Sequence, residues 1–186
     1  MQLLASRRDE QSWTMRERRT TQARRGIPFP APSVKSDTAT LRKNRMPENA
    51  LFYVAVKACI FDGDKLLMTQ GKDSMCWELP GGRINHDEIG KPFDTVLLRE
   101  IEEELGGNIS INIGNVATHY LRTTHQGDPV FLVCIHCTSK SGFITLSAED
   151  ASFAWMTEKK SLKLPLIKNF ESALHAIWEY HNSLQP

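Results

Sequence analysis

Three glutamates in one short acidic segment, Glu100, Glu103 and Glu104, are spaced so that a helix would place them on a single face. Like charges at this spacing repel each other and destabilise a helix by roughly a few tenths of a kcal/mol per pair. A divalent cation would reverse that cost, and carboxylate oxygens are the ligands that Mg²⁺ and Mn²⁺ prefer. The spacing therefore indicates a metal site, with an acidic and solvated surface helix as the alternative.

A Pro-Gly-Gly turn precedes the acidic segment, within Trp77-Glu-Leu-Pro-Gly-Gly-Arg83. Because Gly81 and Gly82 have no side chains, their backbone can approach a ligand closely or offer a carbonyl oxygen to a metal. Most Gly-Gly pairs are only turns, so this segment indicates a binding site only in combination with the acidic one.

Taken together, the two segments closely resemble the signature of the Nudix hydrolase family. That signature runs from a glycine to a glutamate and then to Arg-Glu-apolar-x-Glu-Glu-x-Gly. The matching residues are Gly82, Glu88, Arg99, Glu100, Ile101, Glu103, Glu104 and Gly106. Ten residues separate Glu88 from Arg99, three more than is usual in the family. We expect the extra residues to lie in the loop before the helix, where insertions cost little stability.

The resemblance implies roles for the matching residues. The expected catalytic residues are Glu88, Arg99, Glu100, Glu103 and Glu104. The expected ligands of Mg²⁺ (or Mn²⁺) are the Gly81 carbonyl, Glu100, Glu103, Glu104 and Glu149. Glu100 is a candidate for ligand or for general base, and Arg99 is expected to orient Glu88 through a bidentate pair. Asp150 is the alternative to Glu149 as the carboxylate from a distant loop.

Substrate contacts are expected from Gly82 and Arg83, next to the metal. Tyr120, Arg122 and Phe131 are weaker candidates for a base or sugar pocket, because aromatic rings and arginines suit nucleotides. Ordinary packing within a strand is the alternative for each of these three residues.

The surrounding pattern predicts an α/β fold, a Nudix-type α/β/α sandwich with a mixed sheet between helices. Apolar, β-branched segments predict strands over 51–61, 65–70, 129–137 and 152–157, with one or two more within 109–123 that break near Gly114. Helical periodicity predicts helices over 92–105 and along 167–181. Cys134 and Cys137 alternate across a strand, so we expect core packing there and not a zinc site.

Charge divides the chain into two parts. Residues 1–50 hold eleven Lys and Arg against five Asp and Glu, whereas residues 51–186 hold twelve against seventeen. We expect residues 1–48 to form a basic, Pro-containing, flexible arm and residues 49–186 to form the Nudix domain. Three interpretations of the arm stay open. It is a solvated tail, it contacts nucleic acid through its arginines, or translation starts later, at Met15 or Met46, so that the residues before that start do not belong to the protein.

Composition excludes several classes of protein. Hydrophobic residues make up 40% of the 186 residues, which suits one ordinary globular core. No apolar run approaches the roughly 20 residues of a membrane span. Four cysteines and no secretory signal make reduced thiols and a cytoplasmic location the expectation.

The resemblance implies metal-dependent hydrolysis of a phosphoanhydride bond in a nucleoside diphosphate linked to another moiety. Nucleoside triphosphates, nucleotide sugars, dinucleoside polyphosphates and capped RNA all stay open as substrates. The alternatives are an isomerase of diphosphate-bearing isoprenoids and a Nudix-like module that binds nucleotide or RNA without turnover. Assembly into a homodimer is also left open.

Overall fold

The computed structural model describes residues 49–124 and 126–185. The expected basic arm, residues 1–48, lies outside the described residues. Within the described part of the chain, no helix combines the length and apolarity that crossing a membrane requires.

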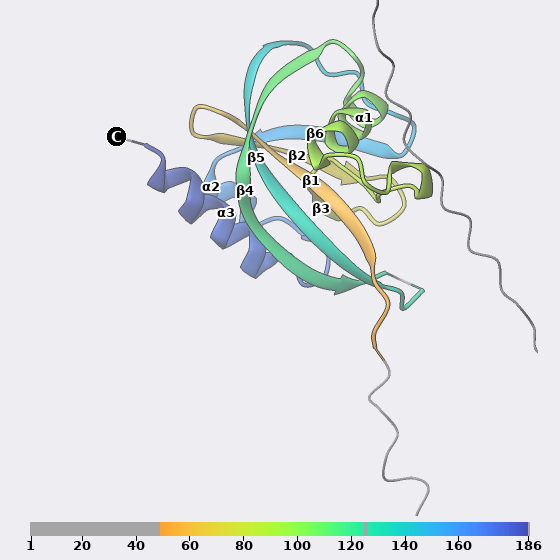
Figure 1. Cartoon of the computed structure of the whole chain (residues 1–186). Coiled ribbons are helices and arrows are strands. Elements are labelled where there is room, and N and C mark those ends of the chain that lie inside the picture. Colours follow the sequence, from red (N-terminus) through yellow and green to blue (C-terminus); the bar gives the residue numbers. More distant parts are fainter. Residues whose placement is uncertain (1–48, 125, 186) are drawn as a thin grey trace, which may run out of the picture. The chain divides into compact units, whose positions relative to one another are not determined.

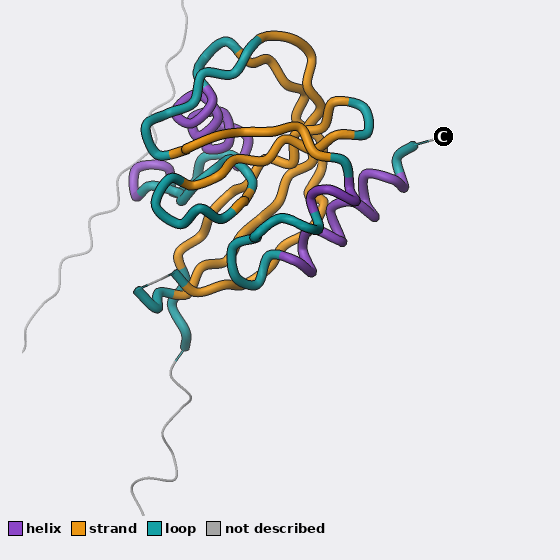
Figure 2. The backbone as a smooth tube through the Cα atoms, turned by 180° about the vertical axis from the view of Figure 1, so that it is seen from behind, coloured by secondary structure: helices purple, strands orange, loops and turns teal. Residues whose placement is uncertain are grey.

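Six strands form one mixed sheet (Figures 1 and 2). They are β1 (Tyr53–Asp62), β2 (Lys65–Gly71), β3 (Trp77–Glu78), β4 (Ile109–Thr123), β5 (Pro129–Gly142) and β6 (Asp150–Met156). The order is β3-β2-β1-β5-β4, and β6 pairs with β2. Only β1 and β5 run parallel; the other pairings are antiparallel. The expected mixed sheet is thereby confirmed.

Helices cover both faces of the sheet, as Figure 1 shows for α1 (Phe93–Leu105) and α3 (Glu171–Ser183). Alternation along β1 divides the core between them. Val56, Ala58 and Ile60 pack with α1, whereas Cys59 and Phe61 pack with α3. A short helix, α2 (Glu158–Ser161), and a 3₁₀ turn, η2 (His86–Glu88), complete the fold. This is the α/β/α sandwich that the sequence predicts.

Local details differ from the sequence-based predictions at several places. The strand β3 and the helix α2 were not predicted, β5 continues to Gly142, and α3 begins at Glu171 and not at residue 167. Residues 109–123 form one continuous strand, and the expected break is only a shift of register between Ile113 and Val116. The strand stays continuous because its residues pair with β5 both before the shift, from Ile109 to Ile113, and after it, from Val116 to Thr123. Pro92 caps α1 and does not belong to it. Cys134 packs on the α3 side and Cys137 on the α1 side, which confirms that they face opposite ways.

The segment 80–84 runs beside β1 and positions the Pro-Gly-Gly turn. The amides of Val56 and Ala58 donate to the carbonyls of Gly82 and Pro80, each at 2.9 Å. These bonds leave the intervening carbonyl, that of Gly81, free of the backbone ladder. The turn is therefore fixed against the centre of the sheet, next to α1.

Candidate active site

The glutamate face of α1 lies against the Gly81–Gly82 turn. Leu97, Ile101 and Leu105 are buried in the core on one side of the helix. This orientation brings Glu100, which is 8% exposed, and Glu104 onto the turn, and the Glu104 carboxylate accepts a hydrogen bond from the Gly81 amide at 2.7 Å. Two of the three expected glutamates thus meet the glycine turn directly.

Both glycines lie in close contact with neighbouring atoms. A Cβ atom at Gly82 would lie 2.5 Å from the Glu100 carboxylate, and one at Gly81 would lie 2.3 Å from the Val56 carbonyl oxygen. Gly81 also has a φ of +121°, which side-chain-bearing residues rarely adopt. Gly81 therefore fits against the β1 backbone where a side chain would not, and a side chain at Gly82 would displace the Glu100 carboxylate.

Arg99 connects the carboxylates of the signature. Its guanidinium donates to both oxygens of Glu88, at 2.7 and 2.9 Å, and to Glu100 and Glu103, each at 2.7 Å. A further bond reaches the Arg83 carbonyl at 3.2 Å. Five donors in a planar fork allow one arginine to serve several carboxylates. The expected bidentate pair with Glu88 is present, and Glu103, 58% exposed at its side chain, joins the site through Arg99.

The environments of the carboxyl groups separate their pKa values. Hydrogen bonds from Arg99 and from the Asn85 amide lower the pKa of Glu88 to about 2. Burial, with repulsion from Asp150 and Glu100, raises the pKa of Glu104 to about 7. Burial likewise raises the pKa of Glu100. Glu88 is therefore a fixed anion, whereas Glu100 and Glu104 carry negative charge at a cost that a cation would relieve.

The sequence analysis missed two charged residues beside the turn, Lys57 on β1 and Glu78 on β3. The Lys57 ammonium donates to the Gly81 carbonyl and lies 3.1 Å from Glu78 Oε2. Burial alone would lower the pKa of Lys57, but Glu78 and Glu104 outweigh it and raise the pKa, so the ammonium stays charged. In the sequence, the one sign of this charged group was Lys57 itself, a lysine inside the apolar segment 51–61.

Arg122 extends this group from β4, with Nη2 3.8 Å from Glu78 Oε2. Its Nε atom is buried without a hydrogen-bond partner. Arg122 was a weaker candidate for substrate contact, and the structure brings it to the same charged group as Lys57. Arg83 lies elsewhere, with its guanidinium 4.4 Å above the Tyr53 ring.

The two candidates for the distant carboxylate are placed differently. Asp150, at the start of β6, is near enough to repel Glu104, and burial raises its own pKa. Glu149 is exposed and lines a hollow beside residues 71–74. The electrostatic influence on Glu104 therefore favours Asp150 over the expected Glu149, whose side chain lies exposed at that hollow.

The donor set fits a hard divalent cation in chemistry, because it offers carboxylate oxygens and the Gly81 carbonyl. Burial and the neighbouring carboxylates raise the pKa of Glu104, and a cation at this place would stabilise its charged form. No three His, Cys, Asp or Glu side chains of residues 49–124 and 126–185 are already gathered as metal ligands. Arg99 donates to Glu103, and Lys57 donates to the Gly81 carbonyl. Both hydrogen bonds would change if a divalent cation took these oxygens as ligands.

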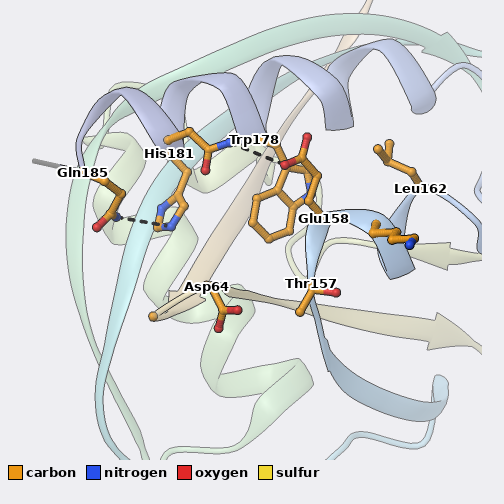
Figure 3. A pocket seen from close by; sticks show the side chains of 10 residues that line it. Asp64, Thr157, Glu158, Leu162, Trp178, His181 and Gln185 are labelled. Atoms are coloured by element: carbon orange, nitrogen blue, oxygen red, sulfur yellow. Dashed lines mark hydrogen bonds between the residues drawn. The ribbon is translucent and has the colours of Figure 1, made fainter.

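A second hollow, of about 680 Å³, lies beside α2 and α3 (Figure 3). Trp178 and His181 line it together with Asp64 and Glu158. Among residues that the structure describes, its lining contains two carboxylates, those of Asp64 and Glu158, and a single lysine, Lys159, with no arginine. That balance suits a polyphosphate poorly, so the glutamate face of α1 remains the candidate site.

Comparisons with known proteins agree with this geometry. The family model of the Nudix domain matches residues 51–175. A MutT-like protein of Streptomyces ambofaciens is 29% identical over 93 residues, which are 50% of this chain and 55% of that relative. The chain thus matches about half the length of this curated relative.

Solved structures show the same fold at low identity. The E. coli ORF135 protein has a TM-score of 0.59 at 23% identity, covering 73% of this chain and 94% of that one. An ADP-ribose pyrophosphatase from Streptococcus suis has a TM-score of 0.57 at 24% identity, covering 73% and 96%. The family model spans most of the chain and includes the glycine turn and the glutamate helix, so the chain belongs to the Nudix hydrolase family.

Proposed function

We propose that this protein hydrolyses a phosphoanhydride bond in a nucleoside diphosphate linked to another moiety, with a divalent cation as cofactor. The observation that carries the proposal is the contact between the glutamate face of α1 and the Gly81–Gly82 turn, with Glu104 bonded to the Gly81 amide. The name of the Streptococcus suis relative, an ADP-ribose pyrophosphatase, supports this substrate class.

The residues that would hold the cation are Glu100, Glu103, Glu104, the Gly81 carbonyl and, from β6, Asp150. When bound, Mg²⁺ or Mn²⁺ supplies neutralisation of phosphate charge and a lowered pKa for the attacking water. Arg99 orients Glu88, Glu100 and Glu103 at once. These side chains are therefore already ordered before the cation binds, which lowers the conformational entropy that binding costs.

Two carboxyl groups are suited to accept the proton of the attacking water. Glu100 and Glu104 both border the Gly81–Gly82 turn, and the one that does not ligate the cation is available as the base. General-base help contributes about 10²–10⁴ in rate. The remaining rate enhancement must come from positioning and from charge neutralisation at the diphosphate.

A binding module without turnover is the alternative from a different class of protein. The complete set of signature carboxylates, with Arg99 connecting them, supports hydrolysis over this alternative. An isomerase of isoprenoid diphosphates would share the cation but release no phosphate, so product identity separates it from hydrolysis.

The decisive experiment is a substrate screen with Mg²⁺ and, separately, with EDTA. Nucleoside triphosphates, nucleotide sugars, ADP-ribose, dinucleoside polyphosphates and capped RNA represent the open classes. We expect cation-dependent release of a nucleoside monophosphate, phosphate or pyrophosphate, and the products identify which anhydride breaks. Binding of a nucleotide without any product under these conditions would support the binding module instead.

A further inference from the structure

Lys57 occupies an unusual place for a lysine, in the interior of the sheet beside the proposed active site. Its side chain is 7% exposed, and it is the one lysine among the described residues that is buried. Lys57 follows Val56 and precedes Ala58, which both pack toward α1, so its side chain leaves β1 on the opposite face. A buried ammonium persists only when it is paired.

The hydrogen-bond acceptor of Lys57 is the Gly81 carbonyl, the same oxygen that the proposed function assigns to the cation. The carbonyls on either side, Pro80 and Gly82, are occupied by amides of β1. Gly81 is therefore the position where the turn offers an oxygen to the site, and the ammonium occupies it in this structure.

The second contact of Lys57 is an ion pair with Glu78. Glu78 Oε2 is buried and lies 3.1 Å from the ammonium nitrogen. The ammonium therefore keeps a charged partner within reach if it leaves the Gly81 carbonyl. Arg122, 3.8 Å from the same oxygen, does not occupy that place.

An ammonium and a divalent cation at one carbonyl oxygen repel each other strongly where water is scarce. We propose that Lys57 is a displaceable internal cation of the active site. It holds the Gly81 carbonyl while no metal is bound and shifts to Glu78 when a divalent cation binds. This inference rests on the proposed function, because it requires a cation at Gly81. Lys57 is on this view a positioning residue that sets metal affinity.

The test measures Mn²⁺ binding without substrate, by the electron paramagnetic resonance signal of free Mn²⁺. Lys57→Met removes the competing charge, and we expect it to bind Mn²⁺ at least about fivefold more tightly than the natural protein. Lys57→Arg keeps the charge and is expected to remain within about twofold of it. The matched control is Lys65→Met, which removes an exposed lysine from β2 and should leave the affinity unchanged.

Equal or weaker Mn²⁺ binding by Lys57→Met would overturn the inference, as would tightening of the same size in Lys57→Arg. If Lys57→Met fails to fold because Glu78 loses its partner, Glu78→Gln and the double variant Lys57→Met/Glu78→Gln replace it. These two differ only at Lys57, and we expect the double variant to bind Mn²⁺ at least about threefold more tightly. Absence of Mn²⁺ binding by the natural protein would instead refute the proposed metal-dependent function, and the inference with it.

Discussion

Arg99 binds both carboxylate oxygens of Glu88, from Nε at 2.7 Å and from Nη2 at 2.9 Å. The pair forms although three extra residues separate the two positions compared with the usual family signature. The insertion is accommodated after the η2 turn, where Gly90 has a φ of +90° and a Cβ there would meet no atom within 4 Å. A loop in open space absorbs the added length, and Glu88 still reaches Arg99 on α1.

Arg99→Lys should therefore disrupt the site although it keeps the charge. A lysine has three N–H donors in place of five and lacks the planar fork, so it cannot make the four bonds that Arg99 makes to Glu88, Glu100 and Glu103. We expect the melting temperature to fall by several degrees and kcat/KM on the confirmed substrate to fall at least about tenfold. Glu102→Gln, which changes an exposed neighbour on the same helix, is the control. A normal kcat/KM in Arg99→Lys would show that Arg99 does not organise the site.

Gly82→Ala should displace Glu100 from the turn, because the new Cβ would lie 2.5 Å from its carboxylate. We expect a loss of about 10²-fold in kcat/KM, the effect of misplacing a reacting group by about 1 Å. Gly90→Ala separates this effect from backbone strain, since it costs about 1 kcal/mol at positive φ without a collision. The measurements are kcat/KM and the melting temperature of both variants. An equal loss of kcat/KM in Gly82→Ala and Gly90→Ala would refute the steric argument.

Glu103→Gln and Glu104→Gln should each lose at least about 2–3 kcal/mol of transition-state stabilisation, or roughly 30–150-fold in kcat/KM. The reason is the loss of one negative oxygen from the expected cation site, while the fold is retained. Glu102→Gln changes an exposed neighbour on the same helix and serves as the control. Unchanged turnover in both test variants, on a confirmed substrate, would exclude their role.

Asp150→Asn should weaken Mn²⁺ binding at least about fivefold, because Asp150 acts electrostatically on Glu104 from β6. Glu149→Gln changes the adjacent carboxylate, which is exposed beside residues 71–74, and should stay within about twofold of the natural protein. Titration of both variants with Mn²⁺ compares them directly. The reverse ranking would restore Glu149 as the distant ligand.

The buried pair His136 and His181 should make stability fall in acid. His136 Nε2 and His181 Nδ1 are 3.1 Å apart, and His181 stacks on Phe61 with ring centroids 3.7 Å apart. Burial lowers the pKa of both histidines below the ordinary 6.5, and repulsion from His181 lowers that of His136 further. The unfolded chain then binds more protons, so stability is complete above pH 6.5 and is lost as the pH falls through the folded-state values.

Urea unfolding at about pH 7.5 and about pH 5, in EDTA, measures this dependence. We expect the natural protein to lose more unfolding free energy between the two pH values than His136→Gln does. The acidic active-site groups are common to both proteins, so their contribution cancels in the comparison. An identical loss in the two proteins would show that the histidine pair does not titrate as inferred.

The sequence by itself determined the helix, the turn and the family. The spacing of Glu100 and Glu104 places both carboxylates on one helical face, and the buried leucines of α1 fix which way that face points. These features depend on neighbours within a few turns of chain, which periodicity describes well. The signature residues are therefore readable without a structure.

Only the tertiary structure decided the contacts that join distant segments. Lys57 lies 24 residues before the Gly81 carbonyl that it binds, and the pairing of β6 with β2 brings Asp150 within electrostatic range of Glu104. The sequence pattern could not separate Asp150 from Glu149, because the two carboxylates are adjacent and the start of β6 falls between them. Where the strand begins depends on its pairing register in the sheet, which in turn depends on how the whole core packs.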